Sequence, residues 1–252
     1  MGPWLITSRT LYNRNQAMIE AALYLIPVQL SEGDLTAVLP QFNIAVVSEI
    51  KHYIVENVRS ARRFLKKCDK NIDIDSLTFA ELNKYTRPED IAPMLSPLEK
   101  GEAVGVISEA GCPAIADPGA DVVALAQRKG YKIKPLVGPS SILMGLMGSG
   151  FNGQSFAFLG YLPIDNGERI RKFKEMEHRI MHEHQTQIFI ETPYRNNNLM
   201  AELCKTMPAS IKLCVATDIT GTSESIVTRG VKQWLKQLPD LHKVPTIFLL
   251  YK

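Results

Sequence analysis

The sequence predicts an α/β protein with mixed sheets and covering helices. Short apolar runs typical of strands alternate with amphipathic runs typical of helices from Ala22 to the C-terminus, a pattern found in parallel or mixed sheets. A glycine-rich segment at Gly138–Gly153 interrupts this alternation and suits a domain junction. The 252 residues, 45% of them hydrophobic, suffice for two small domains. We therefore expect a domain over 21–138, another over 139–252, and a poorly ordered extension over 1–20.

Apolar runs bounded by polar residues predict five strands in the first half, at Ala22–Val28, Ala45–Val47, His52–Glu56, Ala103–Glu109 and Lys132–Val137. Val58–Lys67 predicts a helix, because its apolar residues share one face. Pro88–Leu98 predicts a weaker helix, because Pro93 and Pro97 interrupt it. Asp117 and Pro118 are typical of an N-cap and first helical position, and predict a helix that ends at Arg128 before Gly130.

The same patterns continue in the second half. The turn Gly138–Ser141 opens a small-residue helix at Ile142–Met147. Further helices are predicted at Glu168–Glu183 and Arg195–Cys204, with a short one near Trp234. The predicted strands are Ser155–Leu162, Thr186–Glu191, Lys212–Ile219, Ser225–Thr228 and Thr246–Tyr251.

The charge balance permits an anionic partner without requiring one. Lys and Arg number 29 and Asp and Glu 26, which gives a net charge of +3, whereas a dedicated nucleic-acid binder is usually more basic. The four cysteines, Cys68, Cys112, Cys204 and Cys214, form no C-x-x-C pair and fit neither a zinc nor a disulfide framework. No apolar run approaches the roughly 18 residues that span a bilayer. We therefore expect a cytoplasmic protein without a membrane partner.

Two motif-like patterns have stronger structural than functional interpretations. The glycines of Gly148–Gly153 match G-x-G-x-x-G, but a helix precedes them and a strand follows, which is the reverse of a dinucleotide site. We interpret them as a flexible junction. His178, His182 and His184 lie on a highly charged helix without a cysteine or an H-E-x-x-H motif, so no metal site is expected. The sequence contains neither G-x-x-x-x-G-K-[ST] nor G-x-S-x-G, which excludes the commonest nucleotide and serine hydrolases.

The most informative segment is Gly105–Gly119, where a buried strand ends and small or rigid residues lead to the helix that follows. In open α/β sheets, ligands bind beyond the carboxyl ends of the strands, and a loop without large side chains lets a ligand approach the backbone. A simple connection would need only one turn glycine and a cap. This loop adds further prolines, glycines and carboxylates, so we interpret it as a binding loop.

Within it, Ser108–Gly119 (SEAGCPAIADPG) resembles the S-[DE]-A-G-x-P-x-x-x-D-P-G motif of the ribosomal RNA small-subunit ribose 2′-O-methyltransferases, the cytidine-specific branch of the tetrapyrrole methylase superfamily. Pro135–Ser140 (PLVGPS) is similar to that family's P-L-P-G-P-x segment. Gly160–Pro163 (GYLP) is similar to its G-F-L-P, and Glu191–Arg195 (ETPYR) to its E-S-x-x-R. The order and spacing match from Ala22 to Lys252.

The resemblance implies two α/β domains that hold S-adenosylmethionine in the cleft between them, in a homodimer. It also implies ribosomal RNA or the small ribosomal subunit as the partner. The implied cofactor-binding residues are Pro27, Ser108, Glu109, Ala110, Gly111, Gly138, Pro139, Ser140, Ser141, Tyr161, Leu162, Thr192, Ala216 and Thr220.

Three segments depart from the family's pattern. Its P-x-P-I-G-N loop appears as Pro27–Asp34 (PVQLSEGD) and its E-D-T-R as Glu56–Arg59 (ENVR). Its L-T-K appears as Ile219–Gly221 (ITG), which lacks the lysine. These departures leave two alternatives open, a methyltransferase for a small planar acceptor such as a tetrapyrrole and a non-catalytic module that binds S-adenosylmethionine.

Methyl transfer to a ribose hydroxyl benefits from a base near that hydroxyl. Glu109 and Asp117 are the carboxylates of the motif, and Asp117 is expected to cap its helix, so Glu109 is the predicted catalytic residue.

The predicted substrate-binding residues are cations on two helices, Arg59, Arg62, Arg63, Arg169 and Lys172. Those on the first helix either bind RNA phosphates or simply lie in solvent. Those on the second either receive the RNA backbone or pair with glutamates three and four residues away. The sequence leaves both interpretations open.

Overall fold

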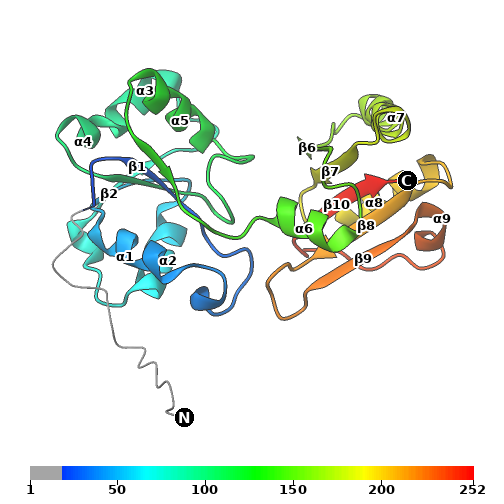
Figure 1. Cartoon of the computed structure of the whole chain (residues 1–252), viewed down its shortest axis with the longest axis horizontal. Helices are drawn as coiled ribbons and strands as arrows, with labels where there is room; N and C mark the ends of the chain where they lie inside the picture. The colour runs from blue at the N-terminus through cyan, green and yellow to red at the C-terminus, as the bar shows by residue number, and fades with distance from the viewer. Residues whose placement is uncertain (1–18) are drawn as a thin grey trace, which may run out of the picture.

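The computed structural model describes residues 19–252 and contains two five-stranded sheets, one in each half of the chain (Figure 1). The first sheet comprises β1 (Leu23–Ile26), β2 (His52–Val55), β3 (Thr78–Glu81), β4 (Val104–Ile107) and β5 (Ile133–Pro135). The second comprises β6 (Phe156–Tyr161), β7 (Thr186–Ile190), β8 (Lys212–Thr217), β9 (Ser225–Gly230) and β10 (Thr246–Tyr251). The predicted α/β class with mixed sheets is confirmed.

The first sheet is entirely parallel, in the order β3-β2-β4-β1-β5, and helices cover both of its faces (Figure 1). One face carries α1 (Gln41–Glu49) and α2 (Val58–Cys68), and the other carries α3 (Pro88–Met94), α4 (Ser96–Glu99) and α5 (Gly119–Arg128). Two short 3-10 helices lie at Leu35–Ala37 and Ile74–Ser76. Because both faces are covered, β1 and β4 are buried along their whole length, as their uninterrupted apolar sequences predict.

Three elements of the first half differ from the sequence prediction. The predicted strand Ala45–Val47 is wrong, because these residues form part of α1 and bury Val46 and Val47 against the sheet. The strand β3 escaped prediction because it is a short edge strand without a buried residue. The predicted Pro-interrupted helix divides into α3 and α4 at Leu95.

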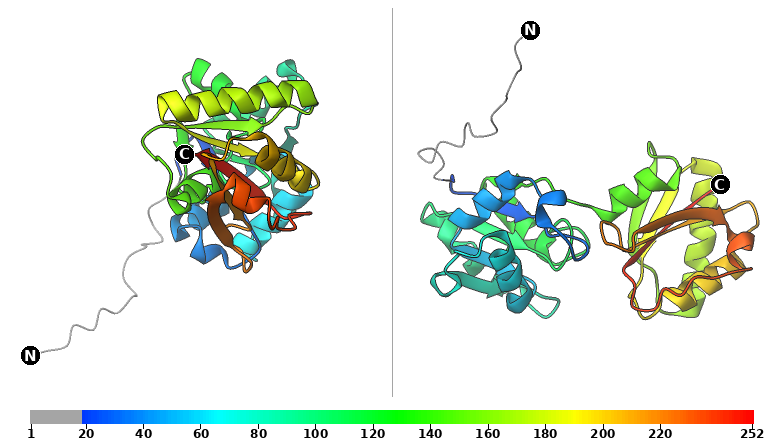
Figure 2. Two further views of the ribbon diagram at one scale, coloured as in Figure 1. Left: turned by 90° about the vertical axis from the view of Figure 1, so that its right-hand side faces the viewer. Right: turned by 90° about the horizontal axis from the view of Figure 1, so that it is seen from below.

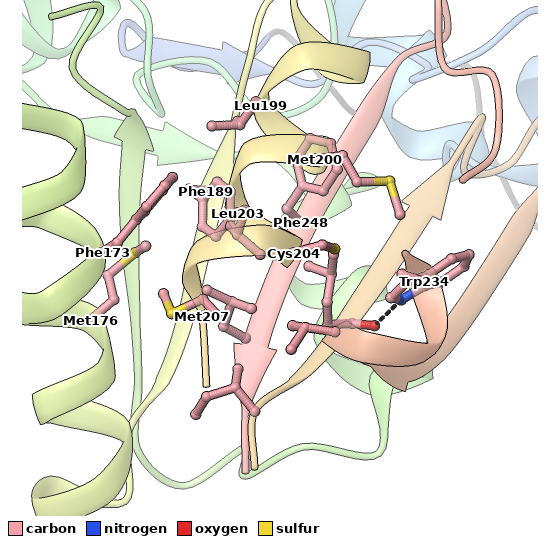
Figure 3. Close-up of a cluster of buried hydrophobic side chains, with 14 of the residues drawn as sticks. Phe173, Met176, Phe189, Leu199, Met200, Leu203, Cys204, Met207, Trp234 and Phe248 are labelled. Carbon is pink, nitrogen blue, oxygen red and sulfur yellow. Dashed lines mark hydrogen bonds between the residues drawn. The ribbon is translucent and has the colours of Figure 1, made fainter. Parts of the chain in front are cut away.

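The second sheet is mixed, in the order β6-β7-β10-β8-β9, and only β6 and β7 are parallel. One face carries α7 (Asn166–Glu183), α8 (Asn196–Thr206) and α9 (Val231–Trp234), and α7 runs across it (Figure 2). The core beneath these helices includes the stacked rings of Phe189 and Phe248 (Figure 3). Trp234 closes one side of this core, where its Nε1 donates to the Leu213 carbonyl at 2.9 Å.

The opposite face carries α6 (Ser141–Ser149), whose glycines have packing roles. A Cβ at Gly148 would lie 2.8 Å from Ile226, so only glycine permits this approach of α6 to β9. Gly150 ends the helix with a φ of 75°. The G-x-G-x-x-G pattern therefore begins in a packed helix end, which explains two of its glycines without a nucleotide.

The chain passes from the first sheet to the second at residues 136–140, between β5 and α6 (Figure 1). The predicted division between 21–138 and 139–252 falls within this connection. A second link between the halves is the hydrogen bond from Ser31 Oγ to the Ile219 carbonyl, at 3.1 Å.

Most of the predicted N-terminal extension, residues 1–18, lies outside the described residues. At its end, Glu20 forms ion pairs with Lys132 and Lys134 beside β5. Within residues 19–252, none of the helices has the length and apolar character that crossing a membrane requires.

Candidate functional site

Two adjoining cavities open beyond the carboxyl ends of the parallel strands β1, β2 and β4. We call them the small cavity, of about 310 Å³, and the large cavity, of about 680 Å³. Leu30, Glu109 and Ala110 line both of them. Each receives residues from both halves of the chain, since Phe158 and Tyr161 line the small cavity and Asp218 and Thr222 the large one. This is the place where open α/β sheets bind ligands.

The loop between β4 and α5 has an unusual backbone. Gly111 has a φ of 70° and pairs with Val28, whose N–H donates to the Gly111 carbonyl at 2.9 Å. Ala114 and Ala116 also have positive φ values, of 67° and 60°, which non-glycine residues rarely adopt. The loop therefore holds local strain, as binding loops often do.

Asp117 stabilises this loop through its side chain. Its Oδ1 accepts hydrogen bonds from the N–H groups of Gly119, at 2.7 Å, and Ala114, at 3.0 Å. The predicted N-cap position is wrong by one residue, because α5 begins at Gly119 with Pro118 as its N-cap and without a side-chain cap among the described residues. Asp117 instead stabilises the turn that leads into the helix. Burial raises the pKa of the Asp117 carboxyl, and the backbone hydrogen bonds oppose that increase.

Three carboxylates, those of Glu56, Glu109 and Asp117, line the small cavity. The pKa of Glu56 is raised from its usual value, chiefly by burial and then by the charges of the other two. Sequence reasoning missed Glu56 as a site residue. Glu56 directly follows β2, which pairs with β4 so that Val55 lies beside Ile107. Glu56 therefore comes close to Glu109 only because of the order of the strands in the sheet, which the sequence did not reveal.

We expect Glu56→Gln to stabilise the protein at neutral pH. A carboxyl whose folded pKa is raised favours folding only while protonated, and this contribution is lost as the pH rises through the raised value. The advantage of Gln should therefore be present at pH 7 and disappear below the ordinary value of 4.5. Urea unfolding at pH 7 and near pH 4 measures it, and an equal difference at both pH values would contradict it.

Seven of the predicted cofactor-binding residues meet at the small cavity: Ser108, Glu109, Ala110, Gly111, Ser140, Ser141 and Tyr161. Apolar residues that were not predicted complete its wall, among them Leu30, Ile142, Phe158 and Ile190. Phe158 and Ile190 belong to β6 and β7, and Ile142 lies in the first turn of α6, so only their position in the cleft distinguishes them from core residues.

The other predicted cofactor residues lie elsewhere. Gly138, Pro139 and Thr220 line a third cavity of about 400 Å³, and Pro27 packs tightly against Gly138.

Three further side chains have structural partners. Leu162 and Ala216 are 3% and 1% exposed and belong to the cores on opposite faces of the second sheet. The Thr192 hydroxyl accepts a hydrogen bond from Arg195 Nε at 3.2 Å. The structure therefore does not bring the side chains of Leu162, Thr192 and Ala216 to either cavity.

The three predicted arginines of α2 point in different directions. Arg63 lines the large cavity, together with Lys67 one turn further along the helix. Arg62 instead lies over the Phe79 ring, with its Cζ 5.4 Å from the ring centre, on the side of β3. Arg59 is exposed outside the cavities.

Arg169, a predicted substrate-binding residue, has internal partners in the structure. Its guanidinium forms an ion pair with Glu202 at 2.7 Å, donates to the Pro163 and Ile164 carbonyls, and is 18% exposed. Lys172 pairs with Glu175 at 2.9 Å. Lys172 therefore pairs with a glutamate three residues away, as the structural interpretation expected, whereas Arg169 pairs with a glutamate of α8.

The histidines of α7 form a surface feature. The rings of His178 and His182 stack with their centres 4.4 Å apart. Within the described part of the chain, no group of three or more histidine, cysteine or carboxylate side chains could hold a metal ion.

Sequence comparison with known proteins identifies relatives among the ribosomal RNA small subunit methyltransferase I proteins. The chain is 29% identical over 205 residues to the ribosomal RNA small subunit methyltransferase I of Vibrio cholerae, a match that covers 81% of this chain and 67% of the relative. It is 31% identical over 181 residues to the protein of that name from Streptococcus pyogenes serotype M6, covering 72% of this chain and 59% of the relative. The chain thus spans about two thirds or less of the length of these relatives. No protein-family profile matches it.

The fold is shared with tetrapyrrole methyltransferases of known structure. The methyltransferase CobJ has a TM-score of 0.61 at 14% identity, over 92% of this chain and 94% of that one. The cobalt precorrin-4 methyltransferase CbiF has a TM-score of 0.58 at 14% identity, over 92% and 95%. The chain therefore has the fold of these methyltransferases, and its sequence is similar to the ribosomal RNA small subunit methyltransferase I proteins.

Proposed function

We propose that this chain transfers a methyl group from S-adenosylmethionine to a ribose 2′-hydroxyl of ribosomal RNA. The observation that carries the proposal is the pair of adjoining cavities with Glu109 in the wall of both. A methyl donor in one cavity and an acceptor hydroxyl in the other would meet at this carboxylate. The names of the sequence relatives support ribosomal RNA as the acceptor.

The small cavity suits S-adenosylmethionine in size and charge. Its volume of about 310 Å³ is at the lower end of the range for small-molecule sites. Among the described residues, its lining includes three carboxylates and neither lysine nor arginine. Such a lining favours a ligand with positive groups, and S-adenosylmethionine carries a sulfonium and an ammonium. Ser108–Gly111 and Ser140–Ser141 would contact it through small side chains and backbone groups.

Glu109 is the residue we assign to the proton transfer. Its Oε2 accepts a hydrogen bond from Ser60 Oγ at 3.1 Å, which orients the carboxylate at the junction of the cavities. S-adenosylmethionine would supply the methyl group, with its sulfonium–methyl bond breaking to leave a neutral thioether. Glu109 would accept the proton that the hydroxyl loses as its oxygen bonds to that methyl. The cleft would hold the hydroxyl oxygen in line with the methyl and the sulfonium.

The test combines calorimetry with S-adenosylmethionine and methyl-transfer assays on two acceptors, small ribosomal subunits from a strain that lacks the gene and a tetrapyrrole. We expect binding and transfer to a ribose, located by mass spectrometry of RNA fragments. If the protein binds S-adenosylmethionine but methylates only a tetrapyrrole, the tetrapyrrole replaces ribosomal RNA as the acceptor. Binding without any transfer would identify a module that binds S-adenosylmethionine without catalysis.

The proposal includes the homodimer that the resemblance implies, the cytoplasmic location, and the two domains 21–138 and 139–252 that the sequence predicts. Sedimentation of the full chain measures the oligomeric state, and a monomer at micromolar concentration would contradict the dimer.

A further inference from the structure

The large cavity has one cationic wall, formed by α2. This helix contains five cations among eleven residues and no acidic residue. Arg63 and Lys67 line the cavity, together with Ser60 and Phe64 of the same helix. Among the described residues, the second half of the chain contributes no cation to this lining: its members there are Asp218, Gly221, Thr222 and Pro245.

The two cavity-facing cations have no strong internal partner. Arg63 forms no ion pair with another residue in 19–252. Lys67 donates to Gln29 Oε1 at 2.8 Å and lies 3.6 Å from Glu32, whose side chain is 97% exposed. An ion pair with so exposed a carboxylate contributes little, so a bound anion could displace it.

The acidic groups of the cavity do not neutralise this wall. Asp218 Oδ2 accepts from the Ser223 N–H at 2.9 Å, within its own turn. Glu109 accepts a hydrogen bond from Ser60, near the N-terminal end of α2. Ser60, Arg63 and Lys67 thus form a line along the helix axis that begins beside Glu109.

We propose that Arg63 and Lys67 bind successive backbone phosphates of the RNA strand that carries the target ribose. The α-helical rise places Arg63 about 4.5 Å and Lys67 about 10 Å beyond Ser60 along the axis. The target ribose lies at Glu109, and the strand runs from there along α2. This inference rests on the proposed function, because it takes Glu109 as the position of the reacting hydroxyl.

The same helix offers a matched control. Arg62 and Lys66 carry the same charge on another face, where Arg62 covers Phe79 and Lys66 donates to the Lys70 carbonyl. The test compares Arg63→Gln/Lys67→Gln with Arg62→Gln/Lys66→Gln in the full chain. Circular dichroism checks folding, and Lys67→Gln alone serves if the first double variant fails to fold.

The measurement is the affinity for a short single-stranded oligoribonucleotide as a function of KCl concentration. Each lost phosphate contact lowers the magnitude of the slope of log affinity against log KCl concentration by about 0.7. The Arg63→Gln/Lys67→Gln variant should therefore lower it by about 1.4, and Lys67→Gln alone by about half of that. The control pair should leave it nearly unchanged. The proposal would be overturned if both double variants lowered the salt slope equally, or if Arg63→Gln/Lys67→Gln left it unchanged.

Methyl transfer to small ribosomal subunits separates this inference from the proposed function. If the wild-type protein transfers no methyl group but the two double variants differ in slope as expected, the proposed function is refuted. The proposed binding of RNA phosphates by Arg63 and Lys67 is then retained. If the wild type and the Arg63→Gln/Lys67→Gln variant transfer the methyl group equally well, the proposed function is retained. The proposed binding of RNA phosphates by Arg63 and Lys67 is then refuted.

Discussion

Glu109→Gln should lower the turnover rate of methyl transfer about 100-fold, the lower end of what a positioned base contributes. The amide cannot accept the proton of the ribose hydroxyl, but it keeps the size of the carboxylate and can still accept from Ser60 Oγ. We expect kcat to fall while KM for the RNA stays nearly unchanged, because the missing interaction belongs to the transition state. Single-turnover assays with saturating cofactor measure this.

The matched control is Asp117→Asn, which removes a charge from the same cavity. Its side-chain oxygen can still accept from Gly119 and Ala114, so the loop should persist and the rate should change little. A Glu109→Gln enzyme with normal kcat but weaker cofactor binding would show that Glu109 is a cofactor ligand and not the base.

Gly111→Val should weaken binding of S-adenosylmethionine tenfold or more, which corresponds to about 1.4 kcal/mol. Gly111 has a φ of 70°, which a β-branched residue tolerates poorly, and a Cβ there would lie 3.1 Å from Leu30 and 3.6 Å from the Pro139 carbonyl. Leu30 lines the small cavity, so the valine would disturb the wall where we propose that the cofactor binds. Calorimetry measures the affinity.

Gly130→Val provides the control for backbone strain. Gly130 has a similar φ, of 72°, and lies at the end of α5 away from the cavities. Among the described residues, no neighbouring atom would lie within 4 Å of a Cβ at this position. This variant should lose stability while keeping its cofactor affinity. Unchanged affinity in a folded Gly111→Val protein would show that the cofactor binds elsewhere.

Much of the element order follows from local sequence, but two short segments show its limit. The run Ala45–Val47 suits a strand or a buried helical turn equally well, and its packing in α1 decides between them. Strand β3 exists because β2 offers it a partner, since its own residues have little apolar pattern.

The same limit applies to the candidate site. The binding loop was recognisable because its turn glycine, prolines and aspartate act over a few residues. Glu56 was missed because it approaches Glu109 only through the pairing of β2 with β4. The ion pair of Arg169 was not foreseen because its partner, Glu202, lies 33 residues away on α8.

The sequence by itself determined the α/β class and the loop Ser108–Gly119, because these depend on periodicity and on interactions between near neighbours. Only the tertiary structure decided which charged groups meet. Arg63 and Lys67 line the large cavity while Arg62 covers Phe79, a difference set by the rotation of α2 on the sheet. That rotation results from the burial of Ala61, Phe64 and Leu65 in the core, and it is a property of the packed fold.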